Sequence, residues 1–145
     1  MNKKEMEYKI KELEMLIAER HSISSPTDVY KCSCDLIDNW NQEHFIVHAI
    51  DQQNKIISSK TIHIGGTGRA IVDPKNVFTF LLLQPRIAAM IVVHNHPSGQ
   101  LKPSNEDIAI TMKLKASAQM LDIAFLDHVI LTQTDYYSFQ TQGHI

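Results

Sequence analysis

A continuously apolar run over residues 87–93 constrains the fold of this 145-residue chain more than any other segment. A run of this length without polar breaks is typical of a strand that is buried on both faces of a sheet. It leads directly into His94, Asn95 and His96, and Pro97 then ends the strand. Side chains two residues apart in a strand point to the same side. The sequence therefore predicts that His94 and His96 face one point at the end of this strand, with Asn95 facing away.

A helix start follows the histidine pair after a short turn. Pro103 restricts the residue before it, and Ser104 is suited to an N-cap with Asp107 in the first turn of a helix over residues 104–121. This order of strand, turn and helix turns the Asp107 carboxylate toward the strand end. Two imidazoles and one carboxylate form a donor set used by catalytic zinc, with one coordination position left open. Iron, cobalt or nickel would also fit such a set.

Each half of this pattern also has a purely structural explanation. Ser104 and Asp107 have the spacing of a capping box, with Asp in the place of the usual Glu or Gln. A His-x-His pair at a strand end is also compatible with two partly solvated imidazoles. Taken singly, such motif matches carry a high false-positive rate. Their combination, in the order that a metal site requires, favours metal binding by His94, His96 and Asp107.

The other segments predict a single α/β domain. Helices are expected over residues 3–20 and 104–121 and from the Ser25-Pro26 and Asp73-Pro74 pairs, and further strands over 45–50, 55–64 and 123–131. This succession predicts a mixed β-sheet flanked by helices. Residues 1–41 are expected to form a helical lead-in packed on a domain over 42–145. The glycines at 65, 66 and 68 predict a turn into another short strand, because no Lys-Ser/Thr pair follows as in a phosphate loop.

Charge and cysteine content restrict the partners and the compartment. A formal net charge of −2, with Lys and Arg scattered along the chain, gives no electrostatic footprint for nucleic acid. The chain start has no apolar signal segment, and no apolar run is long enough to span a membrane. Cys32 and Cys34 are expected to be free thiols on a helix. We therefore expect a cytoplasmic protein without membrane contact.

The motif HNHPSG at residues 94–99, followed by Pro103-Ser104 and Asp107, resembles the signature of the JAMM/MPN+ (JAB) zinc metallopeptidases. With LDHVI at 126–130 and Tyr137-Ser138 downstream, it looks like their RadC-like branch, and the resemblance runs from about residue 43 to 138. It implies a JAB/MPN fold, similar to that of zinc-dependent nucleobase deaminases. It also implies a zinc ion held by His94, His96 and Asp107 with water in the fourth position. A glutamate on an earlier segment would then act as general base, and Ser104 would stabilise the oxyanion.

Glu43 is the best candidate for that general base. In JAMM proteins the base precedes an apolar strand near the start of the domain, and Glu43 stands just before the predicted strand 45–50. No carboxylate occurs between Asp51 and Asp73, so the second strand of the hairpin cannot supply one. The other glutamates lie on the N-terminal helix or inside the metal motif. The structural alternative for Glu43 is a solvated charge at a strand edge.

Asp127 and His128 are left out of the ligand set. Metal-bound imidazoles need partners that orient them, and adjacent strand residues point to opposite sides, so one of this pair could face the site. His48 and His63 lie within predicted strands and are expected to be packed or edge-exposed.

Together these features predict a zinc-dependent hydrolase that cleaves an amide or isopeptide bond in a peptide or protein. The alternative is a non-catalytic MPN-like scaffold or a DNA-repair-associated accessory protein, since the family association leaves a nucleic-acid link open despite the charge. That link is weakened because full-length relatives carry a helix-hairpin-helix region, where we expect only a helical lead-in here. A nucleobase deaminase is disfavoured because His-x-Glu and Pro-Cys-x-x-Cys are absent from the sequence. The substrate and the oligomeric state are not predicted.

Overall fold

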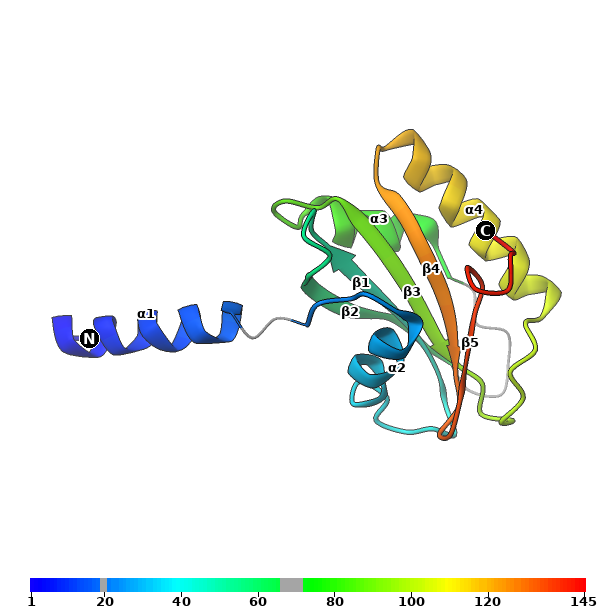
Figure 1. The fold of residues 1–145 in the computed structure, drawn as a ribbon, viewed down its shortest axis with the longest axis horizontal. Coiled ribbons are helices and arrows are strands. Elements are labelled where there is room, and N and C mark those ends of the chain that lie inside the picture. Colours follow the sequence, from blue (N-terminus) through cyan, green and yellow to red (C-terminus); the bar gives the residue numbers. More distant parts are fainter. Residues whose placement is uncertain (19–20, 66–71) are drawn as a thin grey trace.

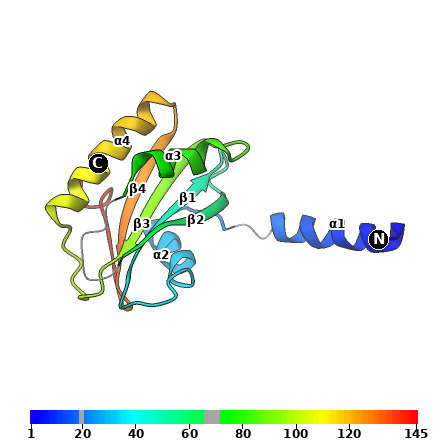
Figure 2. The same cartoon turned by 180° about the vertical axis from the view of Figure 1, so that it is seen from behind.

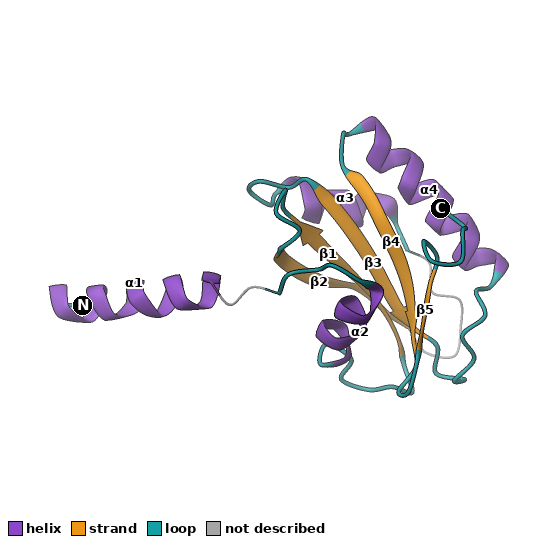
Figure 3. Cartoon of the chain, viewed as in Figure 1, coloured by secondary structure: helices purple, strands orange, loops and turns teal. Residues whose placement is uncertain are grey.

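Five strands form one mixed sheet in the computed structural model, which describes residues 1–18, 21–65 and 72–145 (Figure 1). Their order across the sheet is β2-β1-β3-β4-β5, and every neighbouring pair is antiparallel except β3 and β4. The strands are β1 (Glu43–Ile50), β2 (Ile56–Gly65), β3 (Ala89–Asn95), β4 (Ala124–Leu131) and β5 (Tyr136–Ser138). The helices that follow the N-terminal one lie against this sheet (Figure 3), so the predicted α/β architecture is confirmed.

The helices are α1 (Lys3–Ala18), α2 (Pro26–Cys34), α3 (Pro74–Leu82) and α4 (Asn105–Met120). Helices α2 and α3 each begin with a capping residue followed by proline, Ser25-Pro26 and Asp73-Pro74, as the sequence predicts. Helix α4 connects the two parallel strands β3 and β4, which need a crossover of this kind. Through this crossover, the end of β3 and the start of α4 come from one continuous stretch of chain.

Alternation along the buried strands divides the core into two layers. Phe45, Val47, Met90 and Val92 face α3 and α4, in a cluster that also contains Val77, Leu81, Leu114 and Ala118. Ile46, Ile50, Ile91 and Val93 face the opposite side, where Val29 of α2 packs. Figures 1 and 2 show α2 on one face of the sheet and α3 and α4 on the other. By the same alternation, His94 belongs to the α4 face and Asn95 to the α2 face.

Strand β3 lies two residues later than the apolar run. It covers Ala89–Asn95 rather than 87–93, because His94 pairs with Phe45 of β1 and Ile130 of β4. Pairing with the neighbouring strands therefore determines where β3 ends. For this reason β3 includes His94 and Asn95, the two polar residues that follow the apolar run. Strand β5 was not predicted; its three residues are too short for a periodic pattern, and the strand exists through its pairing with β4.

The described residues of the lead-in expected over 1–41 form helices α1 and α2, which lie differently relative to the sheet. Helix α1 extends away from the sheet (Figures 1 and 2), and Met6, Ile10 and Leu13 on its apolar stripe are each about half exposed. Val29 of α2, by contrast, is buried against the sheet. The short strand expected after the glycines of 65–68 falls in 66–71, outside the described residues.

None of the helices in the described ranges combines the length and the apolar character that crossing a membrane requires.

Candidate metal centre

His94 and His96 meet at the carboxyl end of β3. His94 is the second-last residue of the strand, and the backbone N–H of His96 donates to Leu131 O at 3.0 Å, which extends the pairing with β4. Their Nε2 atoms lie 2.8 Å apart. The Nδ1 atom of His96 lies 2.7 Å from the carbonyl oxygen of Gln100, which can only accept. The Nδ1–H of His96 is thus engaged, so in the neutral ring the lone pair lies on Nε2, which faces His94.

The Asp107 carboxylate joins the two imidazoles from the first turn of α4. Its Oδ1 lies 3.1 Å from His94 Nε2 and its Oδ2 lies 3.1 Å from His96 Nε2. The predicted capping box is also present, since Ser104 N donates to Asp107 Oδ2 at 2.8 Å and Asp107 N donates to Ser104 Oγ at 3.0 Å. Asp107 thus takes part in both arrangements. The cap fixes the helix start at the point where the carboxylate faces the histidines.

The side chains at this cluster favour a positive charge between them. Burial raises the pKa of Asp107, but the contacts of its carboxylate with the His94 and His96 imidazoles outweigh burial and hold that pKa well below its usual range. Burial lowers the pKa of His96, yet hydrogen bonds to Asp107 and the Gln100 carbonyl raise it overall. A proton is therefore held between the imidazoles and the Asp107 carboxylate. Two imidazole nitrogens and a carboxylate at this separation also fit one ion with bonds of about 2.0–2.2 Å.

Glu43 lies at the edge of the same cluster. Its Oε1 is 3.9 Å from His94 Nε2, and its side chain is 25% exposed against 3% for His94. Glu43, His94 and His96 alone place one ligand atom each within 4.8 Å of the others, which would suffice for a metal ion. Asp107 is nearer to both imidazoles than Glu43 is to His94. Asp107 is therefore the carboxylate that lies closest to the two imidazoles, and Glu43 lies farther out.

Asn95 holds the segment that carries Glu43, a role that the sequence did not reveal. Its Oδ1 accepts from His44 N at 2.7 Å, and its Nδ2 donates to Gln42 O at 2.8 Å. The residues on both sides of Glu43 are thus tied to the residue between the two histidines. Alternation predicted that Asn95 faces away, but only the pairing of β1 with β3 determines what it meets there.

Of the pair left open in the sequence, His128 is the residue that faces the cluster. Its Nε2 lies 2.7 Å from His94 Nδ1, and its Nδ1 lies 2.5 Å from Thr111 Oγ1 of α4. The side chain of Asp127 instead accepts from Ser138 Oγ and from the backbone N–H of Gln140. Thr111 was not singled out in the sequence, although its position four residues after Asp107 places it on the same helix face.

Ser104 lies one helical turn before this network and is exposed. Its backbone N–H donates to Asp107 Oδ2 and its hydroxyl oxygen accepts from Asp107 N, so it is joined to the cluster through the capping box. His48 lies on the α2 face, buried between Ser33 Oγ at 2.8 Å and Ser59 Oγ at 2.6 Å, and is therefore a packed core residue.

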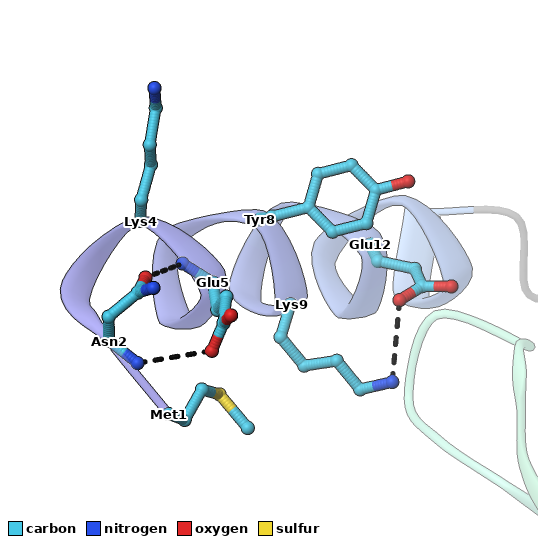
Figure 4. A pocket seen from close by; sticks show the side chains of 7 residues that line it. All are labelled: Met1, Asn2, Lys4, Glu5, Tyr8, Lys9 and Glu12. Carbon is cyan, nitrogen blue, oxygen red and sulfur yellow. Dashed lines mark hydrogen bonds and ion pairs between the residues drawn. The ribbon is translucent and has the colours of Figure 1, made fainter.

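A cavity of about 190 Å³ adjoins the cluster at His96, where Trp40, Pro97 and Thr132 are among the residues lining it. A larger hollow of about 520 Å³ lies on α1 (Figure 4) and contributes nothing to the cluster. Its residues belong to α1 and the two residues before it, and they form a reciprocal Asn2–Glu5 cap and a Lys9–Glu12 ion pair. The size of a cavity therefore does not identify the candidate metal site. The site is identified by the donor atoms of His94, His96 and Asp107, which converge on one point.

Comparison with known proteins agrees with this geometry. The model of the RadC-like JAB domain matches residues 23–144. A UPF0758 protein of Streptococcus uberis (strain ATCC BAA-854 / 0140J) is 41% identical over 127 residues, which cover 86% of this chain and 56% of that protein. A UPF0758 protein of Streptococcus pyogenes serotype M49 (strain NZ131) is 42% identical over 102 residues, covering 70% and 45% respectively. The chain spans about half the length of these curated relatives.

The family match covers the whole sheet, α2 to α4 and every residue of the metal cluster. The expected resemblance is thereby confirmed, and the chain belongs to the RadC-like JAB domain family.

Proposed function

We propose that this domain is a zinc-dependent hydrolase of the JAMM type that cleaves an amide or isopeptide bond in a peptide or protein. The observation that carries the proposal is the convergence of His94 Nε2, His96 Nε2 and the Asp107 carboxylate within 2.8–3.1 Å, with Glu43 3.9 Å from His94. In this assignment His94, His96 and Asp107 hold the metal. Three protein ligands with an open fourth position are typical of catalytic rather than structural zinc.

A zinc ion held by His94, His96 and Asp107 would supply Lewis acidity and lower the pKa of the attacking water to roughly 7. The Glu43 carboxylate takes the proton of the attacking water and returns it to the leaving amine. Its partial exposure suits this role, since a base must reach both water and substrate. The Ser104 hydroxyl donates to the carbonyl oxygen as negative charge develops there. The cavity beside His96 would receive part of the substrate.

Metal analysis is the first test of this proposal. Protein reconstituted with zinc and passed through a desalting column should retain about one zinc per chain, as expected for a single three-ligand site. A His94→Ala/His96→Ala double variant should retain none. Undiminished zinc in the double variant would contradict the ligand assignment. Both proteins should show the same helix and strand content by circular dichroism, so that loss of metal is not a consequence of unfolding.

Replacing Glu43 tests the catalytic half of the proposal. Glu43→Gln should keep its zinc, because the ligands are unchanged, and should lower the hydrolytic rate by roughly 10²–10⁴-fold. The substrate is a peptide mixture from an unfolded protein, and new amino termini are counted by mass spectrometry. Glu106→Gln, an exposed change one residue from Asp107, serves as the matched control and should cleave like wild type.

Two outcomes would revise the assignment. If Glu43→Gln loses zinc, Glu43 is a ligand rather than the base. If wild-type protein binds zinc but yields no zinc-dependent cleavage of any peptide or isopeptide-linked substrate, the domain is a metal-binding scaffold.

A further inference from the structure

A continuous chain of hydrogen bonds joins two residues of the metal cluster through the protein interior. It runs from His94 Nδ1 to His128 Nε2 at 2.7 Å, and from His128 Nδ1 to Thr111 Oγ1 at 2.5 Å. The Thr111 hydroxyl then donates to the backbone carbonyl oxygen of Asp107 at 2.6 Å. The chain thus passes from β3 through β4 to α4 and ends on the backbone of the residue that supplies the carboxylate.

The chemistry of the last acceptor fixes the direction of every hydrogen bond in this chain. A carbonyl oxygen only accepts, so the single hydroxyl proton of Thr111 is committed to Asp107 O. Thr111 Oγ1 then offers only a lone pair to His128, whose Nδ1 must carry a proton. A fully buried imidazole is neutral, so Nε2 of His128 carries none and accepts from Nδ1–H of His94. The remaining lone pair of a neutral His94 lies on Nε2, the atom that faces His96 and Asp107.

The position of the His128 ring is also fixed. His128 is fully buried, and its ring stacks on Phe139 with centroids 4.6 Å apart and planes 17° from parallel. Phe45 contacts it edge-on at a centroid distance of 5.9 Å. Both ring nitrogens are used within the chain, and every buried side-chain nitrogen and oxygen atom of the described residues has a hydrogen-bond partner. The ring therefore has no second arrangement that keeps both of its hydrogen bonds.

We propose that His128 and Thr111 are positioning residues that hold His94 in the one tautomer able to bind a metal through Nε2, before any metal arrives. This inference rests on the proposed function, in which His94 is a metal ligand. Helix α4 then has a second role besides carrying Asp107. Through His128, its Thr111 determines which nitrogen of His94 on β3 carries the proton. Partners of this kind typically change metal affinity by about 10–100-fold when they are removed.

Thr111→Val and Thr111→Ser test the proposal as a pair. Valine keeps the shape and removes the hydroxyl, whereas serine keeps the hydroxyl. Zinc affinity, measured by competition with a chelator, should fall about 10–100-fold in Thr111→Val and stay close to wild type in Thr111→Ser. Ser33→Ala is the matched control, because it removes a hydroxyl from the buried His48 on the opposite face of the sheet. It should lower thermal stability without changing zinc affinity.

The tautomer of His94 in zinc-free protein is a second readout, which a merely structural role of Thr111 would not change. Long-range ¹⁵N–¹H spectra should show a proton on Nδ1 alone in wild type and Thr111→Ser, and a mixture of tautomers in Thr111→Val. Wild-type affinity together with a single Nδ1–H tautomer in Thr111→Val would overturn the inference, as would an Nε2–H tautomer in wild type. If wild type binds no zinc, the proposed function fails, but the zinc-free spectra still decide whether the chain of hydrogen bonds sets the tautomer.

Discussion

At the scale of single residues, the Ser104 hydroxyl can both cap a helix and donate a hydrogen bond, because its oxygen accepts while its proton is donated. Ser104 Oγ accepts from Asp107 N at 3.0 Å and so caps α4. Accepting uses a lone pair, while the hydroxyl proton is left for another acceptor. The capping box and the proposed oxyanion donor are therefore compatible. From the sequence alone, the two roles of Ser104 look like alternatives, because the spacing does not show which role uses the lone pair and which uses the proton.

Ser104→Gly and Ser104→Ala distinguish the two uses. As a cap, alanine should cost about 0.5–2 kcal/mol of unfolding free energy and glycine only a few tenths. Both variants lack the hydroxyl, so both should lower turnover by roughly 10²–10³-fold if Ser104 donates to the oxyanion. Denaturant unfolding and zinc content are measured beside the cleavage rate. A glycine variant that turns over like wild type would reduce Ser104 to a capping residue.

Asn95→Asp tests whether the residue between the two histidines positions Glu43. The change keeps the oxygen that accepts from His44 N but removes the amide that donates to Gln42 O. Gln42 O keeps its contact with His44 Nδ1 at 2.9 Å, but the fully buried side chain at position 95 loses its donor, which should cost about 1–3 kcal/mol of unfolding free energy. We expect the cleavage rate to fall while zinc is retained, since His94 and His96 are unchanged.

Asn39→Asp is the matched control for this variant. It makes the same amide-to-acid change at an exposed site, where only the side-chain oxygen is used, as the acceptor from Asn41 N. It should leave both stability and cleavage near wild type. A wild-type cleavage rate in Asn95→Asp would show that the hydrogen bonds of Asn95 to residues 42 and 44 do not affect how Glu43 acts as the base.

At the scale of elements, one buried histidine joins α2 to the sheet. Burial, followed by the nearby His21, lowers the pKa of His48 to about 4. In the unfolded chain the His48 side chain has a pKa of about 6.5. As the pH falls, the unfolded state therefore takes up a proton before the folded state does. Stability from this group is present above pH 6.5 and lost between pH 6.5 and 4. At 1.36 kcal/mol per pKa unit, the full loss is about 3 kcal/mol.

Denaturant unfolding of zinc-free protein at pH 7 and pH 4.5 measures this loss. His48→Gln cannot take up the proton and should show a smaller difference between the two pH values than wild type. The pKa of His128 is also held below its ordinary value, chiefly by burial, so part of the pH dependence should persist in the variant. An unchanged difference would mean that His48 does not contribute.

The elements that sequence predicts well are those whose patterns are local. The apolar run before His94, the Ser25-Pro26 and Asp73-Pro74 starts and the capping box at Ser104 all depend on residues close in sequence, and each appears in the structure. The contacts of Asn95 and His128 join residues 17 to 53 positions apart. No periodic pattern encodes them, because the pairing of β1, β3 and β4 determines which side chains meet.

At the scale of the whole molecule, α1 stands apart from the sheet domain. Its described apolar side chains Met6, Ile10 and Leu13 are about half exposed, so they bury little surface. Removing residues 1–18 should therefore change the unfolding free energy by no more than about 0.5 kcal/mol, the scale of ordinary surface changes. Denaturant unfolding of the shortened chain checks this. A loss of several kcal/mol would instead support the prediction that the lead-in packs on the domain.

Glu43 and the three proposed ligands come from separate parts of the chain. His94, His96 and Asp107 lie within one strand–turn–helix segment, whereas Glu43 enters from β1 and is held there through Asn95. In the proposed function, the residues that would bind the metal and the residue that would move the proton are thus encoded in separate parts of the chain. A change at position 43 alone would then remove the base and leave the metal ligands in place. An enzyme and an inactive metal-binding protein with this fold would therefore differ by one side chain.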